Sequence, residues 1–271
     1  MSVTSFNVNL FNKLRESTDD TKNIFFSPMS ISLALSMLLL GSNGTTKQQL
    51  EEALGFKKNK HFHSDLKELN DVLNYNSKVL QIKLANSVFI SEAFKLDANY
   101  ICDMESAFKS QIQSLDYKKN ADESKTIIND WVASSTNWKI KDLFSELASD
   151  TACVLVSCMY FKGDWYDKFK SYKTRDATFY CKEDKTSTVK MMTKKDCYSY
   201  LSVDEKGFKC VRIPYKLQDF GMLIILPDER FGLKNVIKKL DVKTIENIKD
   251  DENFNSVLIK SWMLTKATHS V

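Results

Sequence analysis

The stretch NIFFSPMSISLALSMLLLGSNGTTKQQLEEALGF, residues Asn23 to Phe56, contains two successive helix signals and decides most of the fold. The first signal is Ser27-Pro28. A serine cap followed by proline is a typical helix start, because the first turn of a helix has no use for the N–H that proline lacks. The run from Ile31 to Leu40 is apolar on all sides apart from two serines. The sequence therefore predicts a helix buried in the centre of the protein.

The second signal predicts a shorter helix directly afterwards. Thr46 and Gln49 have the spacing of a capping box, in which the two side chains bond backbone N–H groups at the helix start. Leu50 and Leu54 lie on one side of this helix and would form its buried stripe. Gly55 would end it, since glycine adopts the left-handed conformation of a C-cap at little cost.

Length and composition indicate one soluble domain over residues 1–271. Hydrophobic residues make up 43% and charged residues 27% of the chain, which is ordinary for a globular protein and excludes a disordered one. The 39 basic and 35 acidic residues are spread along the chain, so no nucleic-acid-binding face is expected. The densest basic stretch, residues 57–61, is interpreted as a solvated loop, with contact to an anionic polymer as the alternative.

Helical periodicity comes first and short strands follow, which predicts an α+β fold. Further helices are expected over Phe6–Leu14, Ser64–Leu73, Tyr100–Phe108, Ser124–Trp138, Leu233–Leu240 and Val242–Ile248. Strands are expected over Leu80–Ile90, Cys153–Phe161, Val189–Met192, Tyr198–Tyr200, Lys209–Ile213 and Gly221–Asp228, the last of them buried. The segment Cys153–Phe161, CVLVSCMYF, is apolar on both faces, which predicts a central strand covered on both sides.

No enzyme motif is present, and we expect no catalytic site, metal or cofactor. The G-x-S-x-G and Walker patterns are absent. His61 and His63 would share one face of a strand and could hold a metal, but a third ligand is not evident and the only other histidine is His269. A Ser-His-Asp triad would need one of these three histidines, which makes it improbable. The six cysteines contain no C-x-x-C pair, and we interpret them as reduced structural thiols rather than disulfides or metal ligands.

A series of sequence blocks resembles the serpin family of protease inhibitors. The blocks are Asn23–Phe56, Leu84–Tyr100, Ile128–Phe144, Thr151–Phe169, Val189–Met192, Val211–Tyr215 and Met222–Asp228. They come in the family's order, and the resemblance extends to about Ile259. Residues 260–271 match no block of the family.

The resemblance implies a serpin-like fold, with N-terminal helices packed on mixed and antiparallel sheets, here incomplete at the C-terminal end. It places the helix that starts at Ser27-Pro28 beneath the largest sheet, in the region over which that sheet opens. The residues that carry the structural motif are Asn23, Ser27, Pro28, Trp165, Pro214 and Pro227. The chain departs from the family at Trp138, where glycine is usual, and at Ser157-Cys158, where Asn-Ala is usual and the asparagine helps to control sheet opening.

The resemblance also implies a mechanism. A serpin offers an exposed loop near its C-terminus to a serine protease, or in some members to a cysteine protease, and the cleaved loop inserts as a new strand into the main sheet. Val257–Ile259 would begin a strand that leads toward the hinge and the reactive loop, and neither of these is in the sequence. We therefore expect that the chain has no reactive bond and does not trap a protease. The alternative is a non-inhibitory binding protein that uses its open sheet edge or its tail.

Further expectations concern association and location. The strand Cys153–Phe161 would lose its neighbour in such a chain, and an unpaired apolar edge predicts self-association. No membrane partner is expected, because the run Ile31–Leu40 is too short to cross a bilayer. Without a signal peptide the chain would stay in the cytosol, with the extracellular space, where many serpins act, as the alternative. Asn43 heads an Asn-Gly-Thr sequence that is either a surface turn or, in a secreted chain, a glycosylation acceptor.

Overall fold

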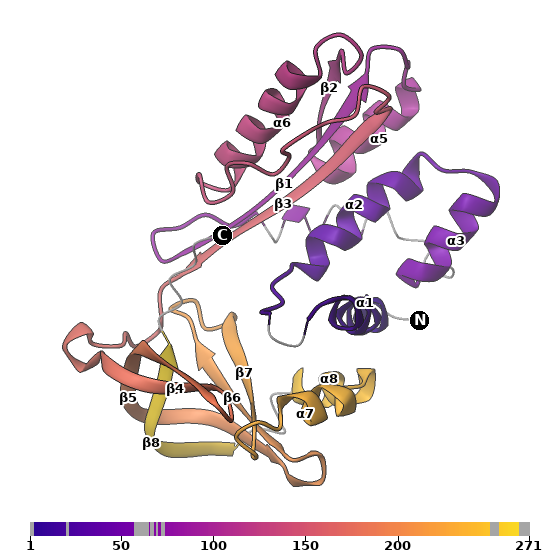
Figure 1. Cartoon of the computed structure of the whole chain (residues 1–271). Coiled ribbons are helices and arrows are strands. Elements are labelled where there is room, and N and C mark those ends of the chain that lie inside the picture. Colours follow the sequence, from indigo (N-terminus) through magenta and orange to yellow (C-terminus); the bar gives the residue numbers. More distant parts are fainter. Residues whose placement is uncertain are drawn as a thin grey trace. The chain divides into compact units, whose positions relative to one another are not determined.

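The computed structural model describes residues 3–19, 22–56, 65, 68, 70, 71, 74–249 and 255–265, with the backbone alone at residues 3, 4, 249 and 255–265. The chain divides into two compact units, residues 1–162 and 163–270, and each unit is described by itself (Figure 1). Helices dominate the first unit and strands the second. This arrangement confirms the predicted α+β class.

The first unit is built on a three-stranded sheet in the order β2-β1-β3. Strands β1 (Leu80–Ser91) and β2 (Gln111–Leu115) are parallel, and β3 (Cys153–Gly163) pairs with the other side of β1. The helices described in this unit are α1 (Val3–Ser17), α2 (Pro28–Leu40), α3 (Gly44–Leu54), α5 (Ala98–Phe108) and α6 (Ala121–Ser135).

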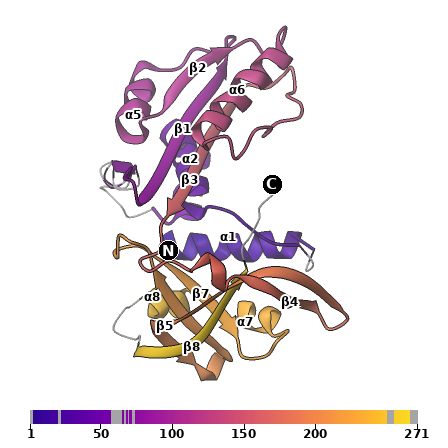
Figure 2. The ribbon, with the colours of Figure 1, turned by 90° about the vertical axis from the view of Figure 1, so that its left-hand side faces the viewer.

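Both faces of β3 are covered within the first unit (Figure 2). Leu155 and Met159 pack against the hydrophobic cluster that includes the core of α2. Val156 and Cys158 belong to a second cluster, which includes the buried side chains of α6. Alternate residues of a strand face opposite sides of its sheet. The continuous apolar pattern of this strand therefore reflects one helical layer on each face.

The start of α3 differs from the prediction. The helix begins at Gly44 behind the N-cap residue Asn43, so Thr46 lies within the first turn and the predicted capping box is wrong. Asn43 holds the N-cap position with extended backbone angles, although its side chain makes no cap bond. Gly55 is confirmed as the C-cap, with a left-handed φ of 79°.

Two other expectations for the first unit need correction. Helix α6 ends at Ser135 rather than Trp138, because Asn137 and Trp138 both adopt positive φ angles. Strand β3 is covered on both faces as predicted, but it lies at an edge of the sheet rather than in its centre. The predicted helix over Ser64–Leu73 falls largely outside the described residues.

The second unit is an antiparallel sheet in the order β4-β5-β6-β7, with β8 also paired to β5. Its strands are β4 (Arg175–Lys182), β5 (Lys185–Val203), β6 (Phe208–Pro214), β7 (Gly221–Pro227) and β8 (Asn255–Thr265). Helices α7 (Leu233–Lys239) and α8 (Val242–Lys249) were both predicted. Side chains from these two helices pack with Phe208, Cys210 and Ile225 of the sheet.

Three strands of this unit differ from the sequence prediction. The segments predicted as two short strands, Val189–Met192 and Tyr198–Tyr200, are parts of the single strand β5, which is 19 residues long. Strand β7 is less buried than predicted, since Met222 is 40% and Leu226 is 48% exposed. Strand β8 continues to Thr265, beyond the short strand expected at its start.

Candidate functional site

The free edge of β3 is the candidate functional site of the first unit. Strand β3 pairs with β1 on one side. Among the residues that the structure describes, no strand pairs with its other side. An unpaired strand edge presents a row of backbone N–H and C=O groups that can accept a further strand. We refer to the free side of Cys153–Gly163 as the β3 edge.

The first turn of α2 is attached to this strand by a serine cluster. The Ser27 side chain caps α2 by accepting a hydrogen bond from the Ser30 backbone N–H at 3.2 Å. The Ser30 hydroxyl also donates to Ser27 Oγ at 3.0 Å. The Ser27 hydroxyl in turn donates to Met159 Sδ of β3 at 3.3 Å. The motif residues Ser27 and Pro28 are thus brought to β3, whereas Asn23 is exposed ahead of the helix.

Ser157 and Cys158 lie on opposite faces of β3. Cys158 is buried in the cluster with α6, and burial raises the pKa of its thiol to about 11. Ser157 lies between Leu155 and Met159 and therefore faces the α2 side. Its Oγ atom is buried and has no hydrogen-bond partner among the described residues. A buried hydroxyl without a hydrogen-bond partner destabilises the fold by about 1–3 kcal/mol. A change that gave the Ser157 hydroxyl a partner would therefore stabilise the fold.

Trp138 is a strained residue at the end of α6. Its φ is 59°, in the left-handed region, and that of Asn137 before it is 50°. The Trp138 N–H donates to the Ala133 carbonyl at 2.7 Å, which closes the helix end. The side chain is 61% exposed, so packing does not compensate the strain. Glycine, usual here in the resembling family, would adopt this conformation at little cost.

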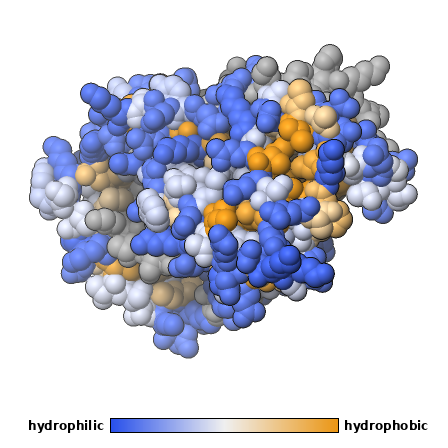
Figure 3. All heavy atoms as spheres, turned by 90° about the horizontal axis from the view of Figure 1, so that it is seen from above, coloured by the Kyte–Doolittle hydropathy of each residue, from blue (hydrophilic) through white to orange (hydrophobic). Residues whose placement is uncertain are grey.

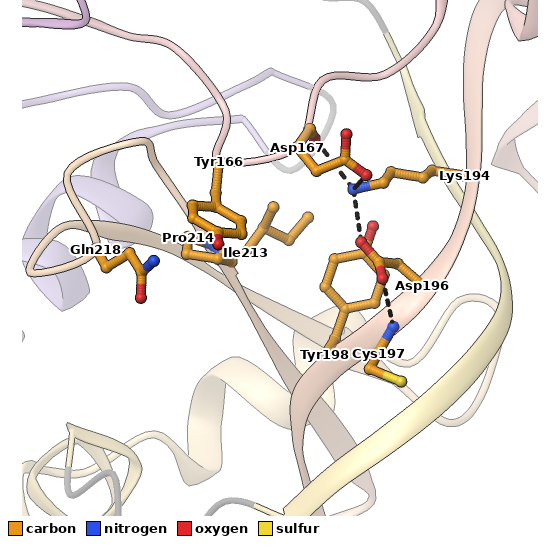
Figure 4. A pocket seen from close by; sticks show the side chains of 9 residues that line it. All are labelled: Tyr166, Asp167, Lys194, Asp196, Cys197, Tyr198, Ile213, Pro214 and Gln218. Carbon is orange, nitrogen blue, oxygen red and sulfur yellow. Dashed lines mark hydrogen bonds and ion pairs between the residues drawn. The ribbon is translucent and has the colours of Figure 1, made fainter.

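The second unit contains a pocket of about 230 Å³ beside β5 (Figure 4). Lys194 Nζ lies 2.7 Å from Asp167 Oδ2 and 2.7 Å from Asp196 Oδ2, and its side chain is only 12% exposed. Burial lowers the pKa of Lys194, but hydrogen bonds to Asp167 and Asp196 outweigh it and raise the pKa overall. The same lysine lowers the pKa of Asp196. Lys194 is thus held between two carboxylates, and this cluster joins β5 to the segment that follows β3.

The remaining motif residues of the second unit are structural. The ring of Trp165 stacks on Tyr215, with centroids 4.8 Å apart and planes 10° apart. Pro214 ends β6, and its carbonyl accepts a hydrogen bond from the Tyr166 N–H at 3.0 Å. Pro227 ends β7 opposite Phe208. In the first unit, Asn43 is exposed at the start of α3 and its side chain makes no cap bond.

Several predicted features are untested by the geometry. His61, His63 and His269, together with the basic stretch 57–61, lie outside the described residues. Within the part of the chain that is described, no group of three or more His, Cys, Asp or Glu side chains is placed to hold a metal ion. Over the same residues, none of the helices combines the length and the hydropathy that a bilayer crossing needs.

Comparison with known proteins gives one consistent family. The family model described as "Serpin (serine protease inhibitor)" matches residues 1–260. The leukocyte elastase inhibitor of Equus caballus is 34% identical over 256 residues, covering 92% of this chain and 67% of the relative. Serpin B4 of Homo sapiens is 31% identical over 260 residues, covering 89% of this chain and 66% of the relative. The chain thus spans about two thirds of the length of these curated relatives.

The solved structures agree on the fold. Ovalbumin from emu (Dromaius novaehollandiae) superposes with a TM-score of 0.92 at 24% sequence identity. The match covers 98% of this chain and 73% of the ovalbumin chain. At this level of identity the likeness establishes the fold and nothing further.

Proposed function

The chain belongs to the serpin family, and from this premise we propose that these 271 residues are the body of a protease inhibitor that does not by itself trap a protease. Serpins inhibit proteases and do not catalyse a reaction of their own, so the chain is not an enzyme. A longer form would act on serine proteases, with cysteine proteases as a second target class.

One observation carries the proposal. The last described residues, 255–265, form a strand paired along β5. A reactive loop must be exposed and free of such pairing for a protease to bind it as substrate. Residues 255–265 therefore do not serve as such a loop, and we expect no trapping by these 271 residues.

Gel electrophoresis in SDS tests this proposal directly. The chain is incubated with an elastase, a chymotrypsin and a papain-type protease, beside the horse leukocyte elastase inhibitor as a control. We expect no band at the summed mass of chain and protease. A band that survives SDS and contains both proteins would overturn the proposal.

We propose as a second function that the β3 edge binds another strand and makes the chain self-associate. The edge is unpaired among the described residues. Phe161, near the end of this strand, is 41% exposed and adds apolar surface. An added strand would cover this surface and satisfy the backbone groups of the edge.

Sedimentation velocity over a range of concentrations tests the association. We expect the wild-type chain to form larger species as its concentration rises, and Phe161→Lys to shift the distribution toward monomer, because a lysine on an edge strand opposes strand addition. Phe94→Lys is the matched control, since Phe94 is 56% exposed but lies outside any strand. Equal behaviour of the two variants, or a wild-type chain that stays monomeric, would contradict the proposal.

A further inference from the structure

Asn43 and Gly44 form an asparagine-glycine pair at the start of α3, and the sequence contains this pair only once. In such a pair the backbone nitrogen of glycine can attack the side-chain amide carbon of asparagine, because glycine has no Cβ atom to shield its nitrogen. We propose that Asn43 is a site of spontaneous deamidation in the folded chain. The attacking group is the protein's own backbone, and the co-reactant is water.

The reaction balances with water alone. The Gly44 backbone nitrogen forms a bond to Cγ of Asn43 and gives up its proton. The bond from Cγ to the side-chain nitrogen breaks, and ammonia leaves with that proton. The product is a cyclic imide, which water opens at either of its carbonyl groups. Opening at one carbonyl gives aspartate, and opening at the other gives isoaspartate.

The structure leaves both reacting groups accessible. Asn43 and Gly44 are exposed, and the Asn43 side chain makes no cap bond that would hold its amide in place. A Cβ atom built on Gly44 would meet nothing within 4 Å among the described residues, apart from its chain neighbours. The first N–H groups of a helix have no intrahelical partner, so the Gly44 nitrogen lies outside the hydrogen-bond ladder of α3.

The backbone at Asn43 is also weakly held. Ring closure brings Cγ of Asn43 to the Gly44 nitrogen, so the Asn43 backbone must rotate from its present ψ of 169°. The Asn43 carbonyl accepts a hydrogen bond from the Lys47 N–H, but at 3.4 Å this bond is long and opposes the rotation little. Gly44, with a φ of 56°, can follow the rotation because glycine adopts many backbone conformations at little cost.

Asn120, at the start of α6, provides an internal reference. It also holds an exposed N-cap position without a side-chain cap bond. The next residue is Ala121, whose Cβ atom shields the backbone nitrogen. The Asn120 carbonyl accepts from the Ser124 N–H at 2.9 Å, which is a normal bond length. Asn120 should therefore deamidate much more slowly than Asn43, although the two residues share exposure and cap position.

Deamidation would change two properties of this site. It places a carboxylate at the N-terminal end of α3, where the helix dipole stabilises negative charge. It also removes the side-chain nitrogen to which a glycan is attached in an Asn-Gly-Thr acceptor such as Asn43 to Thr45. Glycosylation and deamidation of Asn43 therefore exclude one another.

Mass spectrometry of the full chain, made in bacteria and aged at pH 8 and 37 °C, tests the proposal. Aged samples are digested with trypsin, and fragment ions distinguish Asn43 from Asn23, which lies in the same tryptic peptide. An unaged sample digested in parallel corrects for conversion during digestion. A sample aged in guanidinium chloride gives the rate for this sequence without the fold. We expect the folded chain to convert Asn43 within about tenfold of the unfolded rate, and at least about tenfold faster than Asn120.

Gly44→Ala is the matched variant, because it keeps Asn43 and adds a methyl group beside the attacking nitrogen. It should convert Asn43 at least about tenfold more slowly than wild type. The same ratio is expected in guanidinium chloride, so the result does not depend on whether α3 tolerates alanine at a positive φ. An Asn43 that stays intact in the folded chain while it converts in the unfolded chain would overturn the proposal. Equal rates at Asn43 and Asn120, or in wild type and Gly44→Ala, would overturn it as well.

Discussion

Trp138 carries a large side chain on a left-handed backbone conformation that favours glycine. A non-glycine residue in the left-handed region costs about 1–2 kcal/mol, and the exposed indole recovers little of that cost. We expect Trp138→Gly to raise the free energy of unfolding by about 1 kcal/mol, measured by urea denaturation, after allowing for the greater freedom of glycine in the unfolded chain.

The alanine variant at the same position separates the two causes. Trp138→Ala also removes the exposed ring but keeps a Cβ atom, so the backbone strain remains. We expect it to be no more stable than wild type. If the glycine and alanine variants gained equally, the ring rather than the φ angle would be responsible.

At the scale of the element, the side chain of Ser27 fixes the start of α2. Ser27 accepts from the Ser30 N–H and also contacts Met159, so Ser27→Ala should lower the free energy of unfolding by about 1 kcal/mol. Asn43→Ala is the matched control, because Asn43 holds the N-cap position of α3 without a side-chain cap bond. Urea denaturation of the three chains measures the difference. Similar losses in both variants would show that the capping bond of Ser27 is not the cause.

Elements with a pronounced apolar run or alternation were mostly predictable from sequence, and two strands were missed. The buried helix α2 and the strand β1 follow directly from their patterns. Strand β2, with the sequence QIQSL, has no apolar face to reveal it. Strand β4 was missed although Ala177, Phe179 and Cys181 alternate along it, and it is largely exposed. The capping box at Thr46 failed because the helix begins two residues earlier, at Gly44, and its N-cap residue Asn43 makes no side-chain cap bond that a sequence pattern could reveal.

The apolar pattern of β3 predicts that both faces are covered but does not predict the position of the strand in its sheet. Its side chains are apolar on both faces because helices cover both faces of the sheet. That pattern carries no information about how many strands flank it, since strand neighbours are joined by backbone groups that every residue has. The prediction of coverage was therefore confirmed, whereas the prediction of a central place was wrong. For the same reason, the candidate edge was foreseen only through the family resemblance.

At the scale of the whole molecule, alkaline pH should destabilise both units. Burial raises the pKa of the thiols of Cys158, in the first unit, and Cys210, in the second, from an ordinary value of 9.0 to about 11. Above pH 9 the unfolded chain loses these protons while the folded chain retains them, so stability is full below pH 9 and falls as the pH rises toward 11. By linkage each thiol should cost about 1.4 kcal/mol by pH 10.

Denaturation at pH 8 and pH 10 checks this expectation. Cys158→Ala and Cys210→Ala should each reduce the alkaline loss of stability by about 1.4 kcal/mol. An alkaline loss that is the same in wild type and both variants would assign the effect to other groups, such as the tyrosines, whose ordinary pKa is near 10.

The late position of β8 in the chain has a consequence for synthesis on the ribosome. Strands β4 to β7 follow one another and can pair as soon as each emerges, but the partner for the second edge of β5 comes only after β7, α7 and α8 have been made. At roughly 5–20 residues per second, that edge stays uncovered for on the order of several seconds in every nascent chain. Neighbouring chains on one messenger are close together during that interval, so crowding on polysomes is the condition under which this sheet is most exposed to mispairing.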